Sequence, residues 1–91
     1  MSITVRVPSQ LRTLSGGEST VGVEGSTVAE VLAALDQAHP GFTARLFDDG
    51  GQLRRFVNVF VNDEDIRYLG GTDAQVASGT TVSIIPAVAG G

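Results

Sequence analysis

A single helical pattern lies between stretches that alternate like β-strands, and this arrangement limits the folds open to the chain. Four apolar side chains recur at i, i+3, i+4 and i+7: Val28, Val31, Leu32 and Leu35. Thr27 can serve as the N-cap, and Glu30 three residues later completes a capping box. His39-Pro40-Gly41 ends the helix. One main helix must therefore bury its stripe against a sheet.

Strand patterns flank this helix on both sides. The expected strands cover residues 3–7, 21–23, 56–62, 66–69 and 80–85. The first two should pair as an antiparallel hairpin, and residues 66–69 are expected as a short edge strand. Pro86 should end the last strand, because proline has no N–H to donate to a ladder. Between helix and third strand, residues 42–47 suggest a short helical turn and residues 48–51 a loop.

The resulting order, β-β-α-β-β-β, predicts an α+β protein with the β-grasp fold. In this arrangement one main helix covers one face of a mixed sheet, and the N-terminal and C-terminal strands are central. The opposite face is left open to water or to a partner. Residues 1–85 are expected to form this domain, and residues 86–91 a flexible C-terminal tail.

Composition excludes several functional classes. The 91 residues fit one domain. Ten acidic residues against six arginines give a net charge of −4, which argues against binding nucleic acid through its phosphates. No apolar run approaches the roughly 20 residues that span a bilayer, and no signal peptide is visible at the N-terminus. We therefore expect a cytoplasmic protein with no membrane partner.

The chain contains neither cysteine nor lysine. Thiolate catalysis, zinc–thiolate sites and Schiff-base chemistry are therefore excluded. His39 is the one histidine; it has no second ligand nearby and is expected as a helix-end residue. We expect no intrinsic catalytic residue, no metal and no cofactor bound by the chain itself.

The last six residues have no charged side chain and finish with Gly90-Gly91. Glycine lacks a Cβ, so this end can enter a narrow channel, and Gly91 carries the terminal carboxylate. A partner that consumes a nucleotide could adenylate this carboxylate, and a sulfur nucleophile could then displace AMP. The alternative is a glycine tail without function. The position of Gly-Gly directly after the final strand favours the chemical interpretation.

Two stretches carry a family resemblance: residues 55–67, which include Val61-Asn62-Asp63-Glu64-Asp65, and residues 85–91. With the fold pattern, they resemble the MoaD/ThiS family of ubiquitin-like sulfur carrier proteins. Within that family they are most similar to the CysO-type carriers of actinobacterial cysteine biosynthesis. The resemblance extends over essentially the whole chain.

The resemblance implies that an E1-like enzyme adenylates Gly91 with ATP and that the carboxylate becomes a thiocarboxylate. Ala89, Gly90 and Gly91 would thread the active site of each partner. The sulfur would pass to a cysteine synthase-like or other pathway-specific synthase, with a zinc-dependent peptidase releasing cysteine. Two alternatives stay open: a MoaD-like small subunit of molybdopterin synthase, and a non-catalytic β-grasp interaction module.

Phe60 and Ile85 are expected on the sheet face away from the helix, where they would form an apolar docking patch with Val88. Ubiquitin-like proteins usually meet their E1-like enzymes through this face. The alternative is that Phe56 and Phe60 pack against Leu69 or a loop. Two charged stretches, Asp63-Glu64-Asp65 and Arg54-Arg55, are expected as solvated surface, with a partner contact as the alternative.

Overall fold

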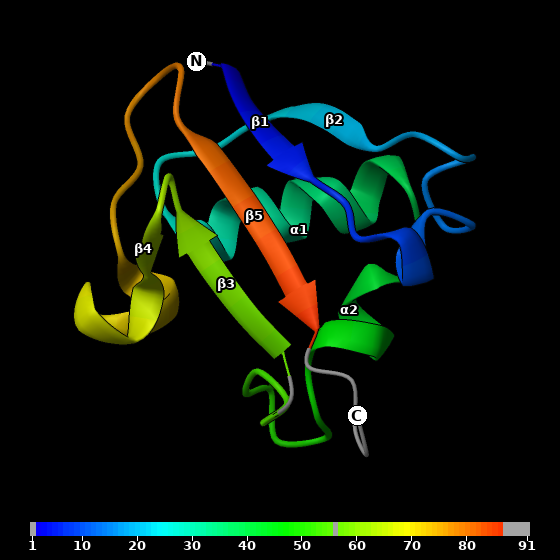
Figure 1. Cartoon of the computed structure of the whole chain (residues 1–91). Helices are drawn as coiled ribbons and strands as arrows, with labels where there is room; N and C mark the ends of the chain where they lie inside the picture. Colours follow the sequence, from blue (N-terminus) through cyan, green and yellow to red (C-terminus); the bar gives the residue numbers. More distant parts are fainter. Residues whose placement is uncertain (1, 56, 87–91) are drawn as a thin grey trace.

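The computed structural model describes residues 2–55 and 57–86, and these form one mixed sheet with helices on one side (Figure 1). The strands are β1 (Ser2–Arg6), β2 (Thr20–Glu24), β3 (Val57–Val61), β4 (Glu64–Asp65) and β5 (Thr81–Pro86), in the order β2-β1-β5-β3-β4. Among the strands of the described residues, only the β1–β5 pair is parallel. The expected β-grasp fold, with the first and last strands at the centre, is confirmed.

Helix α1 (Val28–Ala38) covers one face of this sheet (Figure 1). The Thr27 side chain accepts a hydrogen bond from the Glu30 backbone N–H at 3.2 Å, a cap that typically stabilises a helix by about 1 kcal/mol. The Glu30 carboxylate accepts from the Ser26 N–H at 2.8 Å, one residue before the N-cap. All four residues of the predicted stripe are buried.

The core lies between α1 and alternate residues of the strands. The register places Val5 beside Val82, and Val59 beside Ile84, so these side chains share the helix-facing side. The buried strand residues of this layer are Ile3, Val5, Val23, Val57, Val59, Val82 and Ile84. Because side chains alternate along a strand, the intervening residues must lie on the other face.

The short helix α2 (Phe42–Leu46) is fixed to α1 by a side chain of α1 itself. Its N-cap residue, Gly41, has a φ of 117° and offers no capping side chain. Asp36 replaces that cap: its Oδ1 accepts from the backbone N–H of Gly41 at 3.1 Å and of Thr43 at 3.0 Å. The helix at Phe42–Leu46 confirms the predicted helical turn, and both of its end residues are buried.

The predicted edge strand over residues 66–69 is wrong. Strand β4 is two residues long, and Ile66–Tyr68 form a 3₁₀ helix instead. The Asp65 side chain accepts from the Arg67 backbone N–H at 2.9 Å, which satisfies a donor that a ladder would otherwise use. Ile66, at 3% exposure, is turned into the core and anchors this helical turn.

Strand ends also differ slightly from expectation. β5 runs from Thr81 to Pro86, so Pro86 is the last residue of the strand, opposite Val57, rather than the first residue beyond it. β3 covers Val57–Val61, and Phe56 lies outside the described residues. Within residues 2–55 and 57–86, no helix has the length and apolar character needed to cross a membrane.

The cap on α2 predicts a pH-dependent contribution to stability. Hydrogen bonding, chiefly from the Thr43 N–H, lowers the pKa of Asp36 below 3.8 although partial desolvation opposes it. A carboxyl whose pKa is lower in the folded state stabilises above its unfolded pKa, and the contribution is lost as pH falls through the folded pKa. We expect Asp36→Asn to lower the urea midpoint at neutral pH and to converge with wild type in acid. Asp49→Asn, at an exposed turn position, serves as control and should match wild type throughout.

Candidate functional site

The face of the sheet away from α1, here called the open face, carries a continuous row of side chains across all five strands. Register pairs place Thr20 beside Arg6, Arg6 beside Ser83, Ser83 beside Phe60, and Phe60 beside Asp65. Directly opposed residues on neighbouring strands share a face. The row therefore runs from hydroxyl and cationic groups over β2, β1 and β5 to an aromatic ring and a carboxyl group over β3 and β4.

Phe60 and Ile85 both lie on this open face, as expected. Ile85 faces Asn58 in the register, so it is a diagonal neighbour of Phe60 across the β3–β5 pair. Ile85 is 49% exposed and Phe60 is half-buried. Leu69, the alternative packing partner, is packed against the buried core. Whether a partner uses Phe60 and Ile85 stays a prediction at this point.

The predicted tail residues, Val88, Ala89, Gly90 and Gly91, lie outside the described residues. The structure describes their starting point: Pro86 is the end of β5, the second strand of the central parallel pair. β5 thus continues one residue past the predicted domain boundary. The division into domain and tail otherwise stays a prediction.

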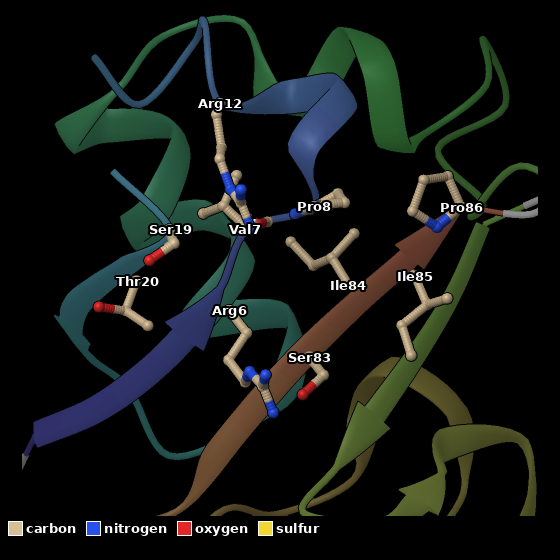
Figure 2. A pocket seen from close by; sticks show the side chains of 10 residues that line it. All are labelled: Arg6, Val7, Pro8, Arg12, Ser19, Thr20, Ser83, Ile84, Ile85 and Pro86. Carbon is tan, nitrogen blue, oxygen red and sulfur yellow. Dashed lines mark hydrogen bonds between the residues drawn. The ribbon is translucent and has the colours of Figure 1, made fainter. Parts of the chain in front are cut away.

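A pocket opens beside this starting point, at the end of the sheet where β1 and β5 finish (Figure 2). Its volume is about 430 Å³. Two arginines line it, Arg6 on β1 and Arg12 in the turn that follows, together with the hydroxyls of Ser19, Thr20 and Ser83 and the apolar Ile85 and Pro86. We call this the tail-base pocket. This pocket could not be predicted from local sequence patterns, because its walls come from segments far apart in the chain.

A polar network borders the apolar patch on the β4 side. Arg67 donates from Nη2 to the Asn58 Oδ1, and its Nη2 lies 3.1 Å from Asp65 Oδ2. The Arg67 backbone N–H and Nε both donate to Asp65 Oδ1, at 2.9 and 3.3 Å. Asp63 and Glu64 are exposed, but Asp65 is only 16% exposed, so the acidic turn is not solvated throughout.

The remaining candidates have structural roles. His39 is the C-cap of α1, and its backbone N–H donates to Leu35 O at 2.8 Å, as expected of a helix-end residue. Arg54 donates from Nη2 to the Ala44 carbonyl at 3.3 Å. Among the described residues, no three His, Cys, Asp or Glu side chains gather where they could hold a metal ion. The open face and the tail-base pocket present guanidinium, hydroxyl and apolar groups.

Known proteins resemble this chain in sequence and fold. The sequence profile of the ThiS family matches residues 5–91. The sulfur carrier protein CysO of Mycobacterium tuberculosis is 44% identical over 93 residues, covering 100% of both chains. Its crystal structure matches with a TM-score of 0.90 at 42% identity, over 94% of this chain and 99% of that one. A chain of the BexX/CysO complex of Amycolatopsis orientalis matches with a TM-score of 0.92 at 48% identity, over 98% and 99%.

The Asp65 network yields a prediction for NMR. The hydrogen bond from the Arg67 backbone N–H, followed by the bond from its side chain, lowers the pKa of Asp65 below 3.8. Arg67→Gln keeps the backbone donor but removes the guanidinium, so the pKa of Asp65 should rise part of the way towards 3.8. A carboxyl-carbon titration measures it, with Arg45→Gln on α2 as control. An unchanged Asp65 pKa would mean that the ion pair contributes nothing.

Proposed function

This chain belongs to the ThiS family, and on that premise we propose that it is a sulfur carrier whose Gly91 carboxylate is converted to a thiocarboxylate by partner enzymes. The observation that carries the proposal is the match to a sulfur carrier protein along the whole length of both chains. The Gly90-Gly91 ending and the placement of Pro86 at the end of a central strand support it.

The proposed chemistry takes place at one carboxylate. An oxygen of the Gly91 carboxylate attacks the α-phosphorus of ATP in an E1-like enzyme, and pyrophosphate leaves. The resulting acyl adenylate is an electrophile, whereas the free carboxylate, ionised at neutral pH, is not. A sulfide then attacks the acyl carbon and AMP leaves, which gives the thiocarboxylate directly. If the nucleophile is a persulfide of the sulfur donor, AMP leaves to give an acyl disulfide, and a second thiol must then attack the donor's sulfur to release the thiocarboxylate and form a disulfide. ATP is thus consumed by the activating enzyme and is not a cofactor of this chain.

In this scheme the chain is a protein co-substrate and not an enzyme. It contributes a terminal carboxylate on a short, uncharged segment and a folded body by which enzymes recognise it. With no cysteine in the sequence, sulfur cannot be held as a persulfide on a side chain, so Gly91 is the position for it. Glycine at both final positions allows close approach of the enzyme's walls to the reacting carbon.

The full-length relatives named CysO favour cysteine biosynthesis as the pathway. The proposed acceptor is a cysteine synthase-like enzyme, and a zinc-dependent peptidase would release the cysteine made on the carrier. A pathway-specific synthase of a specialised product is the variant of this proposal. The genes adjacent to this one separate these cases from a molybdopterin synthase subunit, which would neighbour the large subunit of that enzyme.

Intact-mass spectrometry tests the central step. We expect protein isolated from its host, or incubated with the E1-like enzyme, ATP and a sulfur source, to gain the mass difference between sulfur and oxygen. A variant lacking Gly91 should gain nothing and should unfold at the same temperature as wild type, because Gly91 lies five positions beyond Pro86 in sequence. An unmodified wild-type acid after complete incubation would refute the carrier function.

Replacing Phe60 tests the docking role of the open face. Phe60→Asp puts a charge where an apolar contact is proposed, so the KM for the carrier in adenylation should rise about tenfold or more, as at an interface hot spot. Tyr68→Asp is the matched control, an aromatic residue that is 84% exposed on the 3₁₀ helix after β4. Circular dichroism of both variants verifies the fold. Normal activation of a folded Phe60→Asp variant would count against this surface.

A further inference from the structure

Arg6 stands out on the open face because it is a cation that forms no ion pair with any of the described residues. It is the second residue of the cross-strand row, between Thr20 on β2 and Ser83 on β5. Figure 2 shows its guanidinium lying near the Ser83 hydroxyl. No ion pair joins Arg6 to any carboxylate of residues 2–55 and 57–86, although the chain has ten acidic residues.

Arg6 lines two hollows. One is the tail-base pocket, of about 430 Å³. The other, of about 310 Å³, lies towards the β3–β4 turn and includes Thr4, Thr81 and Asp63. Asp63 is therefore a near neighbour, but it is exposed on the hairpin turn and makes no ion pair with Arg6. Arg6 is exposed to solvent, and it lines both hollows together with the hydroxyl-bearing Thr20 and Ser83.

Arg12 provides a second positive charge at the same pocket. Its Nε donates to the Val7 carbonyl at 3.2 Å, which directs the side chain back towards the end of β1. Its backbone is held too: Arg12 O accepts from the Gly17 N–H at 2.7 Å and from the buried Ser15 hydroxyl at 3.2 Å. None of the residues that line the tail-base pocket is acidic. The pocket is thus lined by positive charge alone, although the protein as a whole has a net charge of −4.

Docking on the open face would bury this charge. Ser83 separates Arg6 from Phe60 by one position in the row, and Ile85 lines the same pocket as Arg6. A partner that covers Phe60 and Ile85 must therefore also remove water from Arg6. Taking a guanidinium out of water without an anion is costly, whereas a carboxylate paired with it in bidentate geometry offsets that cost.

We infer that the tail-base pocket receives an aspartate or glutamate side chain of the enzyme that adenylates the tail, with Arg6 as the paired cation and Arg12 as the second. This inference rests on the proposed function and identifies how the same partner recognises the carrier. The acidic side chain would enter beside Pro86, where the tail begins, so the contact would also set the direction in which the tail leaves the body. Arg6 is in this sense a positioning and specificity residue.

The test is steady-state adenylation by the E1-like enzyme, followed as pyrophosphate release with carrier varied at saturating ATP. We expect Arg6→Glu to raise the KM for the carrier about tenfold or more with kcat unchanged, and Arg6→Gln to raise it less. Increasing ionic strength should raise the wild-type KM and have a smaller effect on Arg6→Glu. Arg45→Glu, an exposed arginine on α2, is the matched control and should keep the wild-type KM.

The outcomes separate the two proposals. Efficient adenylation of wild type together with a KM for Arg6→Glu within about twofold of it would overturn the inference and leave the carrier function standing. A changed KM for ATP, with the KM for the carrier unchanged, would assign the pocket to a phosphate and would also overturn it. Failure of wild type to be adenylated would refute the proposed function, and the inference would fall with it.

Discussion

The parallel pairing of β1 with β5 brings the two ends of the sequence together at the centre of the sheet. Val5 lies beside Val82, both fully buried, and Thr4 N–H donates to Thr80 O at 3.0 Å where the pair begins. Parallel strands need a long crossover, and here the crossover contains α1, α2 and the β3–β4 hairpin. The core forms only when this non-local pair is in register, since a slip by one residue would turn the valines to the open face.

The same register arranges the chemistry of the open face. Placing Val5 beside Val82 necessarily places Arg6 beside Ser83, and it makes both strands finish next to the tail-base pocket. In the proposed docking, the apolar part of the face at Phe60 and Ile85 would supply area for association, and Arg6 would restrict which surfaces can cover it. The apolar surface therefore lies over β3 and β5, and the positive charge of Arg6 lies beside it over β1. A partner with a flat apolar surface but no carboxylate would leave Arg6 buried and unpaired.

Much of the fold could be predicted from local patterns. The stripe from Val28 to Leu35 and the alternation in β3 and β5 are strong signals, because burial on one face decides them. The expected strand at 66–69 failed for a local reason: the Asp65 side chain captures the Arg67 N–H and draws the chain into a 3₁₀ turn. The apolar residues of the segment 66–69 do not indicate that the Asp65 side chain competes with a neighbouring strand for the Arg67 N–H. The positions of Phe60 and Ile85 followed from the alternation. The tail-base pocket did not, because its lining by Arg6, Arg12 and Ser83 depends on the β1–β5 register and on the turn after β1, which one sequence does not reveal.

The direction of the central strands has a practical consequence for handling the protein. Because β1 and β5 are parallel, Ser2, the first described residue of β1, and Pro86, the last residue of β5, lie at opposite ends of the sheet (Figure 1). A five-residue strand spans about 16 Å, so the body itself separates the two attachment points. A fluorophore, affinity tag or solid support joined ahead of Ser2 leaves the tail end clear for an enzyme. A handle at the first end would therefore lie away from the end where the proposed chemistry takes place.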